Sequence, residues 1–186
     1  MKKIILTALM VISTSAMAEI SYSMPALEVG FKWNSMDGLG AISNKQSMGI
    51  QVGGSTVLNI NSEFGVRTGL FYSERPFKGE LSSGPYEGKI SYAEVPVHFM
   101  FKLEDFAGIY IGPSLAMKLG DEITCAPGPC NLTDIKPMIL PITFGAQFKF
   151  TPNLGLNLFF ETVPSDLALG LKNSRGIGMN LLVAFE

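Results

Sequence analysis

Apolar residues alternate with small or charged residues through most of this chain after its first eighteen residues. In the last such stretch every second position is apolar: Ile177, Met179, Leu181, Val183 and Phe185. Side chains of a β-strand point alternately to opposite faces, so each stretch predicts a strand with one apolar and one polar face. The polar faces carry charges that a dry core does not accept without partners. We therefore expect the apolar faces to contact lipid.

The alternation divides the chain into eight predicted strands: 25–34, 47–59, 63–74, 88–102, 107–119, 137–150, 154–164 and 175–185. Their connections alternate between long segments (35–46, 75–87, 120–136 and 165–174) and tight turns (60–62, 103–106 and 151–153). Outer-membrane barrels have short periplasmic turns and longer external loops. The sequence thus predicts an all-β fold, an eight-stranded antiparallel transmembrane β-barrel with its N- and C-termini in the periplasm.

Two groups of residues refine this expectation. The apolar faces of three strands consist of Leu27, Val29, Phe31, Trp33, Leu140, Ile142, Phe144, Ala146, Phe148, Phe150, Leu154, Leu156, Leu158 and Phe160. Three prolines, Pro96, Pro113 and Pro141, fall inside predicted strands. Proline removes a hydrogen-bond donor from the ladder, and a closed barrel has no edges, so we expect bulges or bends at these positions.

The N-terminus has the order of a secretory signal peptide. Lys2 and Lys3 precede an apolar run, and Ala16-Met17-Ala18 supplies a small-x-small cleavage site before Glu19. We expect residues 1–18 to be the signal peptide and residues 19–186 to form the barrel domain. The apolar run is too short to span a bilayer. Export and a lipid-facing barrel together predict the outer membrane of a Gram-negative-type bacterium.

The inward faces carry nine titratable side chains: Glu28, Lys32, Arg67, Glu94, His98, Lys102, Lys118, Lys149 and Glu161. An eight-stranded barrel is just wide enough inside for side chains to fill it, and buried charges require partners. We expect these residues to form a polar network of salt bridges that plugs the lumen. The alternative is a polar path or gate for ions. A soluble, lipocalin-type barrel is disfavoured because its interior is expected to be apolar.

Cys125 and Cys130 are the two cysteines of the chain, and they lie in its longest predicted loop around Ala-Pro-Gly-Pro. Exported proteins meet an oxidising environment, so the pair predicts a disulfide that stiffens this loop. A metal site is the alternative, but two cysteines without a nearby histidine provide too few ligands for a closed site. We expect no metal and no cofactor.

Catalysis requires a nucleophile, a base and an orienting group within mutual reach. The chain has one histidine, His98, and no Gly-x-Ser-x-Gly, His-Glu-x-x-His or phosphate-loop motif. An enzyme that modifies lipid A is therefore the least favoured alternative, and we expect no catalytic residues.

Three short segments resemble the PorT-like family of outer-membrane β-barrel proteins. They are Ser91-Tyr92-Ala93-Glu94-Val95-Pro96-Val97, Ile109-Tyr110-Ile111-Gly112-Pro113-Ser114, and Pro152-Asn153-Leu154-Gly155-Leu156. The resemblance implies a small eight-stranded outer-membrane barrel and supplies no catalytic residues; some members of the family assist protein secretion. Such barrels usually end in an aromatic residue that the insertion machinery reads, whereas here Glu186 follows Phe185.

These observations favour a non-catalytic barrel that acts as a membrane scaffold or interaction protein through its external loops. A narrow channel for small or apolar molecules is the second hypothesis. The expected partners are outer-membrane lipid and lipopolysaccharide, the barrel-insertion machinery, and a protein partner at the external loops. The chain has 14 basic and 16 acidic residues and no basic tract, so no nucleic-acid partner is expected.

Overall fold

The computed structural model describes residues 21–22, 25–38, 43–82, 84–104, 106–126 and 134–185. The expected signal peptide, its cleavage site and Glu186 lie outside these residues. Within the described part, no helix is long and apolar enough to cross a membrane.

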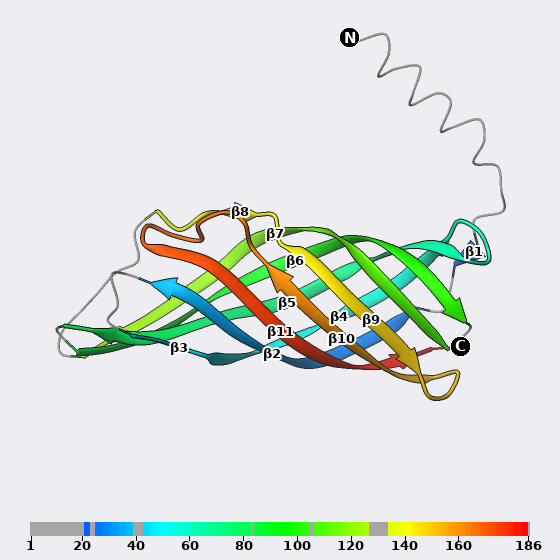
Figure 1. Ribbon diagram of the computed structural model, residues 1–186, viewed down its shortest axis with the longest axis horizontal. Helices are drawn as coiled ribbons and strands as arrows, with labels where there is room; N and C mark the ends of the chain where they lie inside the picture. The colour runs from blue at the N-terminus through cyan, green and yellow to red at the C-terminus, as the bar shows by residue number, and fades with distance from the viewer. Residues whose placement is uncertain are drawn as a thin grey trace, which may run out of the picture.

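Eight long strands form a closed antiparallel barrel (Figure 1). They are β2 (Ala26–Gly38), β4 (Ser47–Asn59), β5 (Phe64–Leu81), β6 (Gly84–Glu104), β7 (Ala107–Cys125), β9 (Ile142–Lys149), β10 (Leu154–Thr162) and β11 (Leu171–Ala184). Each pairs with its sequence neighbour among these eight, and pairing of β2 with β11 closes the ring. Three short strands pair with these long ones: β1 (Ser21–Tyr22) with β4, β3 (Ser43–Lys45) with β5, and β8 (Met138–Ile139) with β7. The predicted fold class is confirmed.

The two ends of the barrel differ. At one end, here named the turn end, short connections join β4 to β5, β6 to β7 and β9 to β10, and the C-terminus lies there (Figure 1). In the first of these turns, the Asn61 side-chain oxygen accepts hydrogen bonds from the amides of Glu63 and Phe64. The opposite end is named the loop end. Because Ala26 pairs with Ala184, the barrel strands begin and finish at the turn end.

At the loop end, strands β2, β5, β6, β7 and β11 are longer than predicted, whereas the predicted strand 137–150 is divided into β8 and β9, and β10 ends at Thr162 instead of 164. The segment 75–87, expected to be a loop, is almost entirely strand, since β5 and β6 remain paired as far as Leu81 and Gly84. Strand β7 continues to Cys125 beside β6. Antiparallel strands pair equally well in water, so nothing requires the ladder to stop where the apolar face stops. The alternation of apolar residues marks the lipid-facing part of each strand rather than its full length.

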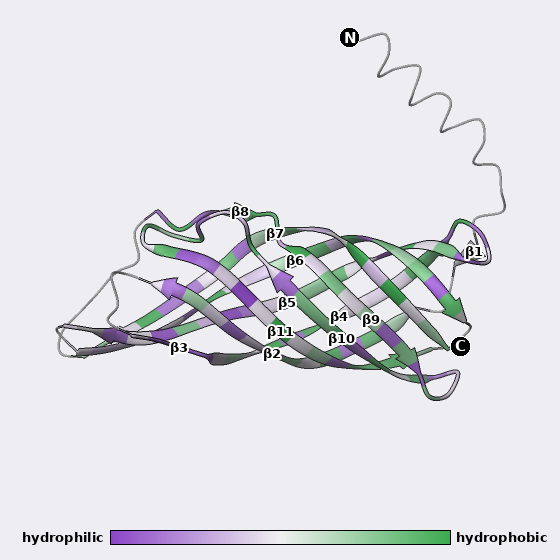
Figure 2. Ribbon diagram, viewed as in Figure 1, coloured by the Kyte–Doolittle hydropathy of each residue, from purple (hydrophilic) through white to green (hydrophobic). Residues whose placement is uncertain are grey.

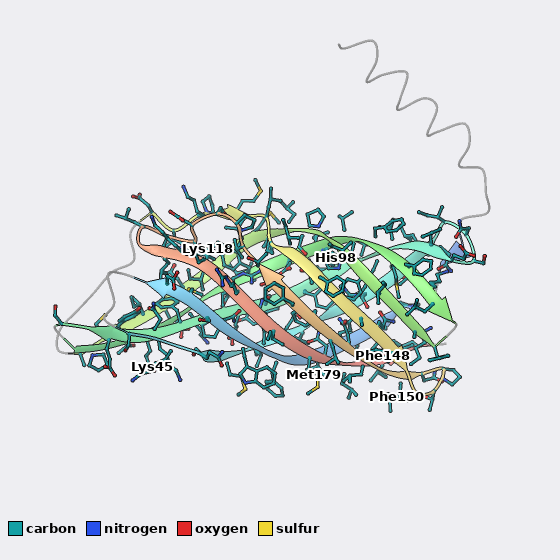
Figure 3. The ribbon with its side chains drawn as sticks, viewed as in Figure 1. Lys45, His98, Lys118, Phe148, Phe150 and Met179 are labelled. Carbon is teal, nitrogen blue, oxygen red and sulfur yellow. The ribbon has the colours of Figure 1, made fainter. Side chains whose placement is uncertain are left out.

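The exterior of the barrel is apolar, as predicted. The exposed residues include every member of the predicted apolar faces except Ala146 and Leu156, which are half-buried. Along the strands, hydrophobic and hydrophilic residues alternate (Figure 2). Phe148 and Phe150 project outward near the turn end, and Met179 projects outward nearer the middle of the barrel (Figure 3). A closed barrel with such an exterior pairs its backbone groups internally and exposes apolar side chains to lipid.

The three prolines within strands interrupt the hydrogen-bond ladders without shifting the register of the paired strands. Around Pro96, strands β5, β6 and β7 keep the same register on both sides of a gap in the pairing. Pro113 pairs with Ile142, and Pro141 lies in the break between β8 and β9, again without a shift. The expectation of bulges was therefore wrong. The register shifts lie elsewhere, for example between Ser91 and Tyr92. A missing amide donor removes one ladder bond, which costs less than re-pairing a whole strand.

Side chains fill the lumen in three layers. Toward the turn end are two small apolar clusters, one of Ala26, Leu182 and Ala184 and one of Val57, Met100, Tyr110 and Phe159. Glycines make room for the rings: a Cβ at Gly178 would lie 2.1 Å from Phe159, and one at Gly145 would lie 2.4 Å from Tyr110. The middle layer is charged. Above it lies a larger apolar core at the loop end, which the sequence did not predict.

Candidate functional site

The first half of the charged layer is built around the carboxylate of Glu28, which is fully buried. It forms a salt bridge with Arg67 and accepts hydrogen bonds from Ser55, from Asn157 at 2.9 Å and from Asn180 at 3.2 Å. These donors come from four different strands, β4, β5, β10 and β11, and Glu28 itself lies on β2. An ionised carboxylate can accept about four hydrogen bonds, and the four donors around Glu28 occupy all of these acceptor positions.

The second half is built around Arg75 on β5, which is also fully buried. Its guanidinium forms salt bridges with Glu161 on β10 and with Glu94 on β6, the latter at 3.0 Å. Lys32 lies 3.2 Å from Glu161 and donates to Ser73 at 2.7 Å. Together the two halves hold three cations and three carboxylates, so the layer is electrically balanced. Balance is what allows charges to remain buried.

His98 lies in the same layer (Figure 3). It resembles a catalytic base only in that one of its ring nitrogens lies close to a serine hydroxyl. Its Nε2 is 3.2 Å from the hydroxyl of Ser114. Its Nδ1, however, is 3.4 Å from the guanidinium of Arg67, which has donors and no acceptor. Nδ1 must therefore accept, so the proton of neutral His98 is on Nε2 and is donated to Ser114. A serine nucleophile needs the opposite arrangement, in which a carboxylate holds Nδ1–H and Nε2 accepts the serine proton.

The structure brings six of the nine predicted inward residues together: Glu28, Lys32, Arg67, Glu94, His98 and Glu161. The other three lie outside this layer. The ammonium of Lys102 bonds to the Asn61 carbonyl in a turn, Lys118 pairs with Asp121 at the loop end (Figure 3), and Lys149 is half-buried near the end of β9. Arg75 was missed because it lay in a predicted loop. Arg75 lies an even number of residues after the inward-facing Arg67 on the same strand, so its side chain points to the same face. This alternation is the signal that could have identified it.

The apolar core at the loop end closes the lumen above the charged layer. Its buried residues are Met36, Phe77, Tyr86, Ile90, Tyr92, Ala116, Ile139, Val163, Leu167, Ala168 and Leu171. Three of them belong to the β10–β11 connection, which is tied to the segment before β8 by a hydrogen bond from the Lys136 amide to the Leu167 carbonyl. The Arg75 guanidinium lies 5.5 Å from the Tyr92 ring, so the charged and apolar layers are in direct contact.

A cavity of about 20 Å³ lies in the charged layer, lined by residues that include Arg67, Glu94, His98 and Glu161. This is the volume that roughly one water molecule needs. Among the described residues, no group of three or more His, Cys, Asp or Glu side chains is placed to hold a metal ion.

A larger hollow lies at the loop end, between β3, β5, β6 and β7. It has a volume of about 310 Å³ and is lined by Lys45, Lys78, Gly79, Pro85, Tyr86, Glu87, Thr124 and Ala126. Lys45 marks this region in Figure 3 and pairs with Glu80. Cationic, aromatic and backbone groups therefore surround one groove at the tip of the molecule. We name it the tip groove.

The predicted disulfide cannot be placed, because Cys130 lies outside the described residues. Cys125 is the last residue of β7, where its backbone pairs with Tyr86 beside the tip groove. The cystine remains a prediction.

Comparisons with known proteins agree on the fold. No protein-family model and no curated protein sequence matches the chain. Among solved structures, Neisserial surface protein A is similar over 89% of this chain and 99% of its own, with a TM-score of 0.58 and 14% identity. Less similar are Ail of Yersinia pestis (15% identity, 86% and 98% covered, TM-score 0.47) and OprG of Pseudomonas aeruginosa (10% identity, 87% and 94% covered, TM-score 0.45).

The ring of eight strands is closed and its exterior is apolar, and the first of these structures shares this fold over 89% of the chain. The chain is thus a small eight-stranded transmembrane β-barrel of the kind found in the outer membrane of Gram-negative bacteria.

Proposed function

We propose that this protein is a non-catalytic outer-membrane scaffold whose lumen is sealed and whose loop end presents a binding surface. The observation that carries the proposal is the filling of the lumen by three successive layers. A solute would have to displace the salt bridges of Arg75 and then the apolar core above them. Opening a buried, balanced set of charges leaves unpaired ions in a low dielectric and is strongly unfavourable.

The orientation proposed is the one expected from the connections, with the turn end in the periplasm and the loop end outside the cell. The tip groove then faces the medium, and the paired strands β5 and β6 hold it away from the membrane surface. Binding functions often lie on loops that a rigid scaffold positions. The exposed apolar side chains of the barrel exterior, here named the lipid-facing belt, would contact lipid as a partner. The same proposal includes a protein partner at the tip and recognition of the C-terminus by the insertion machinery. It also includes the signal peptide and membership of the PorT-like family.

Conductance across a planar lipid bilayer tests the sealed lumen. We expect the purified barrel to give no steady single-channel currents, with gramicidin in the same bilayer as the positive control. Reproducible currents carried by the unmodified protein would favour the alternative, a narrow channel. Mass spectra of lipid A from cells with and without the protein test the enzyme alternative, and we expect identical spectra.

A further inference from the structure

A second groove lies on the exterior of the barrel, at the loop-end border of the lipid-facing belt. It crosses β10, β11, β2 and the segment before β4, and has a volume of about 540 Å³. Its lining residues are Trp33, Ser35, Gln46, Phe160, Arg175, Gly176 and Ile177. Unlike the tip groove, it combines large apolar side chains with a cation on a surface that faces the membrane.

The register shows that the boundary between apolar and polar exterior runs through this groove. Phe160, Ile177, Trp33 and Met48 are paired in one row across four strands, and all four are exposed. The three rows toward the turn end are apolar at their outward positions, apart from Gly54. The next outward row toward the loop end consists of Thr162, Arg175 and Ser35. Arg175 is therefore the first charge beyond a continuous apolar surface.

The guanidinium of Arg175 is available for a ligand. Of the described carboxylates, none lies within salt-bridge distance of it. The nearby Asp37 of β2 instead accepts a hydrogen bond from Asn173 at 2.8 Å. Another outward cation, Lys89 on β6, is neutralised within the protein by Glu74 at 3.1 Å and Glu122 at 3.7 Å. The two positions therefore differ in the charge they offer to the membrane.

We propose that this groove binds the phosphate-bearing lipid A portion of lipopolysaccharide, with one phosphate on Arg175 and acyl chains over Trp33, Phe160 and Ile177. A planar guanidinium binds phosphate through two parallel hydrogen bonds, which a lysine does not reproduce. Ser35 and Gln46 add polar groups at the same border. The apolar rows continue this surface from the groove toward the turn end, where the acyl chains would lie. The proposal rests on the membrane-spanning barrel and the outward loop end of the proposed function.

Native mass spectrometry of the purified full-length barrel in detergent, titrated with bisphosphorylated lipid A, tests this site. We expect saturable binding of one lipid A. Arg175→Gln should weaken it by about ten-fold or more, as the loss of a charge-assisted hydrogen-bonded pair implies. Arg175→Lys should retain part of the affinity. Lys89→Gln is the matched control and should leave the affinity within about two-fold, because that cation is already paired.

Trp33 is the only tryptophan of the chain, so its fluorescence reports directly on the groove. Its emission should change with bisphosphorylated lipid A and much less with lipid A from which both phosphates have been removed. Equal affinity of Arg175→Gln and the parent, or an equal response to the dephosphorylated lipid, would overturn the proposal.

The titration uses the isolated barrel, so its outcome does not depend on which way the loop end faces. Labelling of a tag inserted at residue 83 on intact cells tests the orientation separately. Each variant is first compared with the parent by its gel mobility before and after boiling, so that a misfolded protein is not counted as a failure to bind.

Discussion

Glu28 illustrates how single residues hold the interior together. Its carboxylate is enclosed by donors from β4, β5, β10 and β11, and Arg67 is its main counter-ion. Removing one partner of a buried pair leaves the other charge without compensation. Glu28→Ala should therefore lower the free energy of unfolding by about 3–5 kcal/mol, measured by urea titration in lipid vesicles.

Two controls make this prediction specific. Glu80→Ala breaks the exposed pair with Lys45, in which both side chains are at least half exposed, and should cost less than about 1 kcal/mol. The double variant Glu28→Leu with Arg67→Met removes both charges and should recover much of the loss. A Glu28→Ala effect as small as that of Glu80→Ala would contradict the role assigned to this pair.

At the scale of elements, the hairpin of β5 and β6 supports the loop-end core. Ile90 is fully buried there and belongs to the same apolar cluster as Phe77 and Tyr86. Ile90→Ala should destabilise this region by about 2–5 kcal/mol. In the folded barrel, trypsin cleavage at Lys78 and Lys89 should become at least several-fold faster, while the boiling-dependent gel shift is retained. Val97→Ala, on the lipid-facing side of β6, should leave the cleavage rate unchanged. Loss of the gel shift in Ile90→Ala would instead show that the core and the barrel unfold together.

The same elements show what the sequence can and cannot predict. Parity along a strand is a local property, so the sequence predicts the inward direction of Lys32, Arg67 and Glu161, and all three are buried in the structure. The position of a residue along the barrel axis depends on strand tilt and register. These are set by pairing between residues that are distant in the sequence. This is why Lys102 and Lys149 point inward by parity yet lie near the turn end. Arg75 was missed because a charged pair followed by Pro76 is typical of a loop.

At the scale of the molecule, a closed ladder predicts resistance to detergent. Protein taken from isolated outer membranes should migrate differently on denaturing gels before and after boiling, because the ring of paired strands survives dodecyl sulfate until it is heated. Recovery of the protein in the soluble periplasmic fraction, with one mobility under both conditions, would contradict the membrane assignment. Reduction of the predicted disulfide should not abolish the shift, since Cys125 lies at the tip of the barrel wall and outside its lipid-facing belt.

The salt bridge between Arg75 and Glu94 has a consequence for the order of assembly. The two residues lie on β5 and β6, the two arms of one hairpin, at 3.0 Å from each other. If the arms pair before insertion, they carry a cation and its counter-ion together, and the hairpin enters the bilayer with this pair already neutral. The far half of the hairpin also carries Lys78, Glu80, Glu87 and Lys89, and its apolar residues gain their mutual packing only on reaching water on the other side. We expect this hairpin to cross the membrane as a unit, with the loop-end core forming last.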